Sequence, residues 1–315
     1  MGVQRILVTG GAGFVGSRLT AALVGAGHRV TVVDNLSSMG SQSLLSDVSG
    51  AYEFVHADIR CREDFERIPA GGFDRVYHLA ASFANARSIK EPEYDFRTNV
   101  IGTENVVRFA ERRGCGLFVY TGSSSSYGAA PAPFVEDGPM IPATPYAWSK
   151  KTGEDRVRAS ALPAAIFRLF NVYGPGDVPG VFRNAIPNML AALHEPRGVV
   201  TVHDAASSRD FTFVDDVVGV LRDAESGKGT TTNVGTGHET PVIELASQML
   251  HLLDLPKARI QTGQRRVWDT VVRRRASTER LAERFGRVPS TTLADGLPRT
   301  LTWLRAKGYL PPTAS

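Results

Sequence analysis

Tyr146 and Lys150 are spaced so that together they could perform proton chemistry. They are the first and last residues of the segment Tyr146-Ala-Trp-Ser-Lys150. On a helix, residues four apart lie on one face, so the ammonium group can approach the phenol. A nearby cation favours the phenolate and lowers the pKa of a tyrosine from its ordinary value of about 10. The pair predicts a general base, and the alternative is a surface helix with one tyrosine and one lysine.

Two serines are candidates to assist this base. Ser123 and Ser124 follow the apolar run Leu117–Tyr120. A hydroxyl at the end of a strand could hydrogen-bond the reacting oxygen and share its proton with Tyr146. The sequence leaves both serines open, and the alternative is a serine-rich loop that only caps the strand.

A glycine-rich turn predicts a site for a dinucleotide. The segment Thr9-Gly-Gly-Ala-Gly-Phe-Val-Gly16 follows an apolar strand and opens a helical pattern. Glycines allow a tight turn and a close approach to a pyrophosphate, and the start of the helix offers N–H groups to the phosphates. The predicted cofactor contacts in this turn are Gly10, Gly13, Phe14, Val15 and Gly16.

Asp34 ends the next predicted strand, about 20 residues further on. A carboxylate there accepts hydrogen bonds from the adenosine ribose and repels a 2′-phosphate. The sequence therefore favours NAD over NADP.

The elements that position these residues alternate between strands and helices. Apolar runs predict strands at 6–8, 30–33, 54–55, 75–79, 117–120 and 165–169, with helices between them, including one over 99–113. This rhythm predicts an α/β fold with a Rossmann-type, doubly wound parallel sheet. We expect an NAD-binding domain over 1–172 and a smaller mixed α/β domain, mainly for the substrate, over 173–315. A segment near 205–225 should return to the first domain.

The composition restricts the class of protein. The 315 residues are 42% hydrophobic and 22% charged, which is typical of a globular chain and excludes a disordered one. We find no apolar run long enough for a membrane span and no signal peptide. Cys61 and Cys115 lack metal-ligand spacing and suggest a reducing compartment, so we expect a cytoplasmic protein without a metal. The net charge of +4 and the short arginine runs fit an anionic substrate better than a nucleic acid.

Several longer motifs occur in one order along the chain. The sequence resembles the extended short-chain dehydrogenase/reductases, in particular nucleotide-sugar epimerases and dehydratases of the UDP-glucose 4-epimerase type. Besides the glycine turn and the Tyr146–Lys150 segment, the resemblance is carried by Asp34-Asn35-Leu36, Asp58-Ile59, His78-Leu79-Ala80-Ala81, Asn99 with Gly102-Thr103, the segments 123–128, 168–175 and 209–211, Val214-Asp-Asp-Val217 and Asn233-Val-Gly-Thr-Gly237.

The resemblance implies further site residues. Asp58 and Ile59 should flank the adenine, and additional cofactor contacts are implied for Asn35, Leu79, Ala80, Ala81 and Asn99. The substrate's diphosphate and the groups near it should be held by Asn171, Asn184, Arg209 and Arg266, with Ser123 and Tyr146 at the sugar. The alternatives are an ion pair with Asp210 for Arg209 and a solvated surface charge for Arg266.

The chain departs from the family pattern in two places. The stretch His203-Asp-Ala-Ala-Ser-Ser-Arg209 differs from the usual sequence of a loop that approaches the nucleotide base, so the base stays open. Dehydratases and decarboxylases of the family carry carboxylates in the serine loop, where this chain has Ser124 and Ser125. This difference argues against elimination as the main reaction.

The resemblance thus implies an NAD-dependent nucleotide-sugar 4-epimerase. The alternatives are a decarboxylase, dehydratase or reductase on the same scaffold, and a non-catalytic NAD sensor. A homodimer is also implied, formed through the helices near 99–113 and 146–159.

Overall fold

A seven-stranded parallel sheet forms the centre of the computed structural model, which describes residues 2–195, 198–253, 259–267, 269 and 271–311. The strand order is β11-β6-β5-β4-β1-β2-β3, and each neighbouring pair is parallel. The bounds are β1 (Arg5–Thr9), β2 (Arg29–Asp34), β3 (Glu53–His56), β4 (Arg75–His78), β5 (Leu117–Ser123), β6 (Ala164–Leu169) and β11 (Thr231–Val234). Strands buried on both faces are continuous apolar runs, as β1, β4 and β5 are here.

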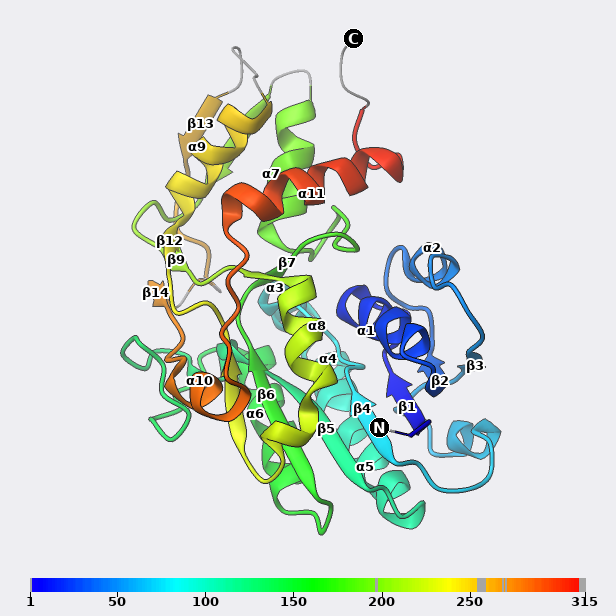
Figure 1. The fold of residues 1–315 in the computed structure, drawn as a ribbon. Helices are drawn as coiled ribbons and strands as arrows, with labels where there is room; N and C mark the ends of the chain where they lie inside the picture. Colours follow the sequence, from blue (N-terminus) through cyan, green and yellow to red (C-terminus); the bar gives the residue numbers. More distant parts are fainter. Residues whose placement is uncertain (1, 196–197, 254–258, 268, 270, 312–315) are drawn as a thin grey trace.

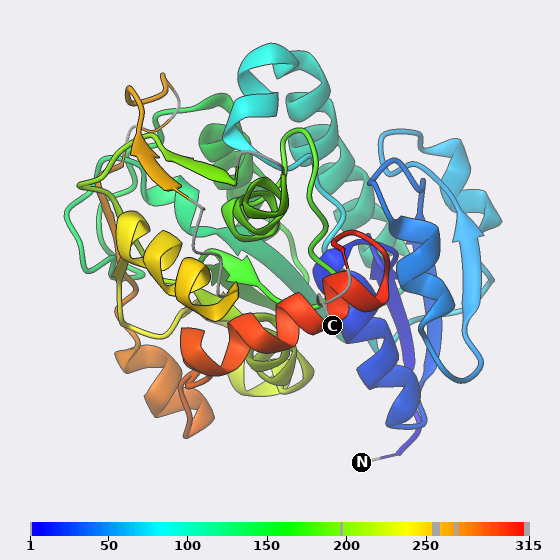
Figure 2. The same ribbon diagram turned by 90° about the horizontal axis from the view of Figure 1, so that it is seen from above.

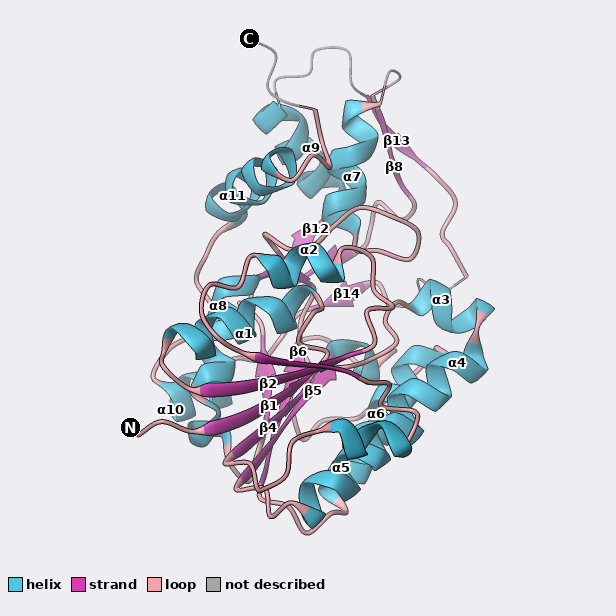
Figure 3. Cartoon of the chain, turned by 90° about the vertical axis from the view of Figure 1, so that its right-hand side faces the viewer, coloured by secondary structure: helices cyan, strands magenta, loops and turns pink. Residues whose placement is uncertain are grey.

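Helices cover both faces of this sheet (Figure 3). On one face, α1 (Phe14–Gly25) packs against α8 (Val214–Arg222), where Leu19 and Val217 are fully buried. The other face is covered by α5 (Thr103–Arg112) and α6 (Pro145–Arg158), which contact each other. The predicted doubly wound α/β fold is therefore confirmed.

The helix expected over 99–113 is longer and less regular than the sequence suggested. It begins with α4 (Pro92–Phe96), continues as a π-helical stretch, η2 (Arg97–Gly102), and becomes regular only in α5. The shorter elements of this region are α2 (Ser41–Ser46), η1 (Glu63–Arg67), α3 (Asn85–Lys90) and η3 (Ser124–Tyr127).

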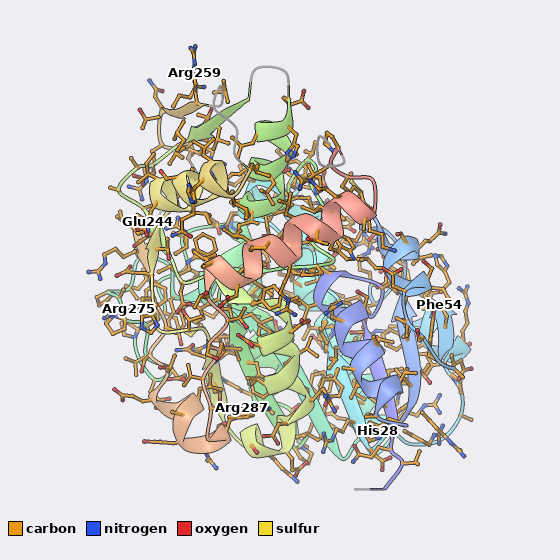
Figure 4. All side chains as sticks on the ribbon, turned by 45° about the horizontal axis from the view of Figure 1, so that its top comes forward. His28, Phe54, Glu244, Arg259, Arg275 and Arg287 are labelled. Atoms are coloured by element: carbon orange, nitrogen blue, oxygen red, sulfur yellow. The ribbon has the colours of Figure 1, made fainter. Side chains whose placement is uncertain are left out.

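The last strand of the sheet comes from beyond residue 172. β11 pairs with β6, although the sequence predicted only six strands. The expected return near 205–225 includes α8, and the chain stays with the sheet through η4 (Ala224–Gly227), β11 and α10 (Glu279–Phe285). After α10, Arg287 Nη2 donates to Gly219 O of α8 at 2.7 Å. Figure 4 labels the Arg287 side chain. The division of the chain at residue 172 stays a prediction.

A smaller helical part lies above the carboxyl ends of the strands (Figure 1). It contains α7 (Ala185–His194), α9 (Val242–Leu253) and α11 (Leu293–Ala306), which share an apolar core with Leu190, Leu245 and Leu301. The short strands are β7 (Val172–Tyr173), β8 (Val199–Val202), β9 (Ser208–Arg209), β10 (Thr212–Phe213), β12 (Thr240–Pro241), β13 (Arg259–Thr262) and β14 (Arg273–Arg274). β14 pairs with β9 in parallel and places Arg274 opposite Arg209.

The end of α11 connects this part to the first half of the chain. In the view from above, α11 runs from the side of α9 towards the α1 and α2 region (Figure 2). Just beyond α11, Lys307 Nζ forms an ion pair with Asp47 Oδ1, at 2.5 Å. Within the described residues, we find no helix whose length and apolar character would suit a membrane crossing.

Candidate active site

A cleft of about 960 Å³ opens at the carboxyl ends of the parallel strands, where β1, β2, β5 and β6 end. In open α/β sheets, this edge is where ligands bind. Its lining brings together the predicted residues Gly10, Gly13, Phe14, Val15, Gly16, Asp34, Asn35, Asp58, Ile59, Leu79, Ala80, Ala81, Ser123, Ser124, Tyr146, Lys150, Asn171, Asn184, Arg209 and Arg266. Cofactor and substrate candidates therefore face one continuous space.

The glycine turn leaves room for a phosphate group at the start of α1. A Cβ atom on Gly16 would lie 2.0 Å from Gly10 O, so only glycine allows this crossing of the chain. Gly10 has a φ of +71°, and a Cβ there would lie 2.5 Å from Ala80 N. Gly13 precedes the helix, and no side chain caps the helix N-terminus. The turn fits the pyrophosphate of a dinucleotide.

Asp34 is anchored beside this turn. Its Oδ2 accepts from Ala12 N at 3.0 Å, and its Oδ1 accepts from Leu36 N at 2.8 Å. Burial raises the pKa of the Asp34 carboxyl, and the two backbone hydrogen bonds oppose this rise. The carboxylate is thus held in one orientation at the end of β2, where it can accept from ribose hydroxyls.

Asp58 and Asn35, predicted to lie near the adenine, line the cleft side by side. Asn35 Nδ2 donates to Asp58 Oδ2 at 2.9 Å, and Arg60 binds the same carboxylate at 2.6 Å. Burial raises the pKa of Asp58, but the hydrogen bonds from Arg60 and Asn35 outweigh it and lower the pKa to about 2. Asp58 is therefore an ionised carboxylate held in a fixed position on the cleft wall.

Tyr146 and Ser123 meet at the centre of the cleft. Tyr146 lies in the first turn of α6, whose N-cap Thr144 accepts from Ala147 N. A side-chain hydrogen bond joins Tyr146 to Ser123, and Ser123 Oγ also accepts from Ser125 N at 3.1 Å. Ser124 lines the same cleft, but the hydrogen bond to Tyr146 is made by Ser123. The geometry therefore favours Ser123 as the assisting hydroxyl.

The pKa of Tyr146 does not shift in the direction expected from a neighbouring lysine. Burial raises the pKa of Tyr146 to about 12, although the hydrogen bond with Ser123 and the charge of Arg274 act against this rise. Lys150 Nζ instead donates to Thr121 O at 2.8 Å. Burial also lowers the pKa of Lys150 to about 8, so its own charge is costly at this depth.

Asn99 does not line the cleft, unlike the other predicted cofactor residues. It is 1% exposed and binds both backbone groups of Ser82, accepting from N at 2.8 Å and donating to O at 3.0 Å. Its amide also donates to Asp95 and to Ser149 of α6. Asn99 thus joins the segment after β4 to α6 from behind the cleft, which spacing along the chain could not reveal.

The residues predicted for the diphosphate also line the cleft. Arg209 does not pair with Asp210; its Nη1 donates to Ser208 O at 2.9 Å and to Val272 O at 3.0 Å. Arg266 Nε forms an ion pair with Asp269 at 2.7 Å. Both arginines therefore line the cleft and also have partners within the protein. Guanidinium groups bind phosphate oxygens well.

Comparison with known proteins agrees with this geometry. A sequence model of the NAD dependent epimerase/dehydratase family matches residues 6–235. The chain belongs to this family. It is 35% identical over 313 residues to a UDP-glucose 4-epimerase of Mycolicibacterium smegmatis, with 96% of this chain and 99% of that protein covered.

Among the solved structures, an epimerase and a dehydratase align with this chain with similar TM-scores. An epimerase from Methanothermobacter thermautotrophicus aligns with a TM-score of 0.87 and 35% identity, over 98% of this chain and 94% of that one. A dTDP-glucose 4,6-dehydratase from Streptomyces venezuelae, solved with NAD bound, aligns with a TM-score of 0.88 and 29% identity, over 98% and 100%. The chain is an NAD-dependent enzyme of this family, and its glycine turn and Asp34 fit that cofactor.

Two cleft residues of the enzyme were missed in the sequence. Arg274 belongs to a run of three arginines, which resembles a solvated surface, and Asp177 lies in a loop rich in glycine and proline. Both are buried, and both line the cleft. No local pattern signals them, because their burial depends on segments distant in sequence.

Asp177 is a buried carboxyl that titrates near neutral pH. Burial raises its pKa to about 7, although the hydrogen bond from Asn184 Nδ2, at 2.9 Å, and the charge of Arg183 lower it. An acid with a raised folded pKa takes up protons on folding, so the folded state loses stability as the pH rises from about 4 to about 7.

The variant Asp177→Asn should remove this loss. We expect the variant to gain roughly 2–3 kcal/mol of unfolding free energy relative to wild type between pH 5 and pH 8, because only the wild-type carboxyl becomes ionised. Urea denaturation at the two pH values measures this. An equal gain at both pH values for Asp177→Asn would contradict the prediction.

Proposed function

We propose that the enzyme is an NAD-dependent nucleotide-sugar 4-epimerase. The observation that carries this proposal is the serine run beside Tyr146, in which Ser123, Ser124 and Ser125 line the cleft without a carboxylate. Oxidation and reduction at one carbon need a single acid–base group, whereas elimination needs a second group for the neighbouring carbon. The UDP-glucose 4-epimerase with 35% identity supports the same reaction class.

Tyr146 is the acid–base group in this proposal. As the phenolate, which the charge of Arg274 and the hydrogen bond with Ser123 favour against burial, it accepts the proton of the sugar 4-hydroxyl as C4 is oxidised, and it returns the proton when the 4-keto sugar is reduced from the opposite face. NAD⁺ supplies the hydride acceptor and, once reduced, the donor. Ser123, hydrogen-bonded to Tyr146, holds the phenol oxygen in position and can relay the proton. Lys150, fixed on Thr121 O, keeps a positive charge one helical turn from the phenol.

The reduction from the opposite face requires the sugar to turn while its nucleotide stays bound. Arg209 and Arg266 line the cleft where they can hold the diphosphate, and Arg guanidinium groups bind phosphate oxygens in a fixed orientation. The cleft of about 960 Å³ extends beyond this anchor to Tyr146, which leaves space for the ring to rotate.

A product assay with C4-deuterated UDP-glucose and UDP-glucuronic acid tests the reaction. An epimerase gives a product of unchanged mass that retains the deuterium at C4, because the hydride leaves and returns to the same carbon. A product lighter by water indicates a dehydratase, and one lighter by carbon dioxide indicates a decarboxylase. Either loss as the main reaction would overturn the proposal.

We further propose that the enzyme forms a homodimer through α5 and α6. Three large apolar side chains are exposed on α6 and on the two elements that lead into α5 and contact α6: Phe96 of α4 (41%), Ile101 of η2 (38%) and Trp148 of α6 (52%). Exposed apolar groups gathered on neighbouring helices are typical of an interface between subunits.

The variant Trp148→Glu should therefore shift the protein from dimer to monomer, because a charge at the centre of an apolar interface loses its hydration. Light scattering coupled to size exclusion at a fixed concentration measures the mass. Val3→Glu, at a residue 70% exposed near the N-terminus, is the matched control and should leave the mass unchanged. A wild-type protein of monomer mass would refute the dimer.

A further inference from the structure

Arg274 is a buried cation in the cleft without an anionic partner. It is 9% exposed and lines the cleft from β14. Its Nη1 donates to Ser125 Oγ at 3.1 Å, and its Nε is buried with no hydrogen-bond partner. Among the cleft-lining residues that the structure describes, it is the one whose side chain leaves a buried polar atom unpaired. An unpaired buried charge costs several kcal/mol, so such a group in a ligand cleft indicates a missing partner.

A second buried arginine, Arg168, shows which hydrogen-bond partners a structural guanidinium group has in this chain. Arg168 is 2% exposed, and its Nε and Nη2 bind both carboxylate oxygens of Glu154, at 3.0 and 2.6 Å. Its Nη1 donates to the hydroxyl of Tyr127 and to Glu136 O. Arg168 thus has protein partners for each nitrogen, whereas Arg274 has one neutral hydroxyl. Within the described residues, no carboxylate forms an ion pair with Arg274.

Arg274 lies at the sugar end of the cleft. Its partner Ser125 is two residues from Ser123, which binds Tyr146. The positive charge of Arg274 lowers the pKa of Tyr146, which places the two groups within electrostatic reach. A carbon that reacts at Tyr146 therefore brings its neighbouring ring substituents towards Arg274.

We propose that Arg274 binds a carboxylate on the sugar ring, so that the preferred substrate is a nucleotide-activated sugar acid, such as a uronic acid. The inference rests on the proposed function in one respect, that the ligand is a nucleotide sugar whose ring lies at Tyr146. A carboxylate would supply the missing negative charge, because a guanidinium group binds a carboxylate with two parallel hydrogen bonds. A neutral sugar hydroxyl leaves the buried charge uncompensated.

The diphosphate is a less suitable partner for Arg274. Arg274 lies opposite Arg209 in the β9–β14 pair, but its Nη1 donates to Ser125 Oγ in the serine run, whereas Arg209 Nη1 donates to Ser208 O and Val272 O. A third arginine on the phosphates would also draw the sugar away from Tyr146. The experiment separates the two roles by including the nucleotide without its sugar.

Calorimetric titration of the NAD-loaded full chain with UDP-glucuronic acid, UDP-glucose and UDP tests the proposal. We expect wild type to bind UDP-glucuronic acid more tightly than UDP-glucose. In Arg274→Gln, this ratio of affinities should fall by roughly 30-fold or more, which is the effect of losing a buried charge pair. Arg274→Lys should restore part of the ratio, because it keeps the charge but not the two parallel donors.

The control is Arg273→Gln, which removes the same charge from the same strand. Arg273 is exposed, pairs with Glu239 and does not line the cleft, so this variant should keep the wild-type ratio. Equal or better binding of UDP-glucose by wild type would overturn the proposal. So would an equal loss of affinity for UDP and UDP-glucuronic acid in Arg274→Gln, which would assign Arg274 to the diphosphate.

The preference for a sugar acid and the type of reaction can be tested separately. If the acid is preferred but its product has lost carbon dioxide, the sugar-acid inference stands and the epimerase proposal fails. If UDP-glucose is preferred and is epimerised at C4 with its deuterium retained, the epimerase stands and the sugar-acid inference fails.

Discussion

Tyr146→Phe should lower the turnover number by about 10²–10⁴-fold, because the variant lacks the phenolic hydroxyl that exchanges the sugar proton in the proposed mechanism. The fold should remain intact, since the side-chain hydrogen bond that is lost is the one with Ser123. We expect the affinity for NAD to stay within a small factor of wild type, because the glycine turn and Asp34 are unchanged. Steady-state kinetics on the sugar nucleotide that wild type converts, together with a fluorescence titration of NAD, measure both quantities.

Tyr52→Phe is a matched control for this result. Tyr52 loses the same atom, but its hydroxyl donates to Leu45 O, and the residue does not line the cleft. Its turnover number should equal that of wild type. A Tyr146→Phe variant with a turnover number within about threefold of wild type would show that another group moves the proton.

Glu154→Gln should cost about 3–5 kcal/mol of unfolding free energy, because it leaves the Arg168 guanidinium buried without its counter-charge. Both side chains are 2% exposed. Glu154 lies on the same face of α6 as Tyr146 and Lys150, at successive intervals of four residues. The ion pair therefore fixes the helix that carries the acid–base group against β6.

Urea denaturation monitored by circular dichroism measures this loss. Asp155→Gln is the control, because the neighbouring Asp155 forms an exposed ion pair with Lys151 and should contribute less than about 1 kcal/mol. A Glu154→Gln variant as stable as this control would mean that Arg168 is compensated by its neutral partners alone.

The pKa values show where spacing along the chain was insufficient. The sequence correctly predicted that Tyr146 and Lys150 share a helix face, yet it predicted a lowered pKa for the phenol. Burial raises that pKa to about 12, since removing water from an ionised oxygen outweighs the hydrogen bond from Ser123. Desolvation depends on every segment that packs around a group, and no local motif contains that information.

Features that need only a few consecutive residues could be predicted from the sequence. The parallel sheet follows from apolar runs separated by helix-length segments, and the cofactor end follows from the glycine turn with Asp34 at the next strand end. These are local because backbone conformation at Gly10 and Gly16, and the alternation of strand and helix, are fixed within short stretches of chain.

Other features depend on contacts between segments that are distant in sequence, so they are seen only in the tertiary structure. It brought β11 into the sheet, moved Asn99 behind the cleft and turned Arg274 inward to Ser125, which is 149 residues away in sequence. Whether an arginine is a solvated surface charge or a buried side chain in a binding cleft depends on which segments pack over it. The position of Arg274 in the cleft therefore arises only when the chain has folded.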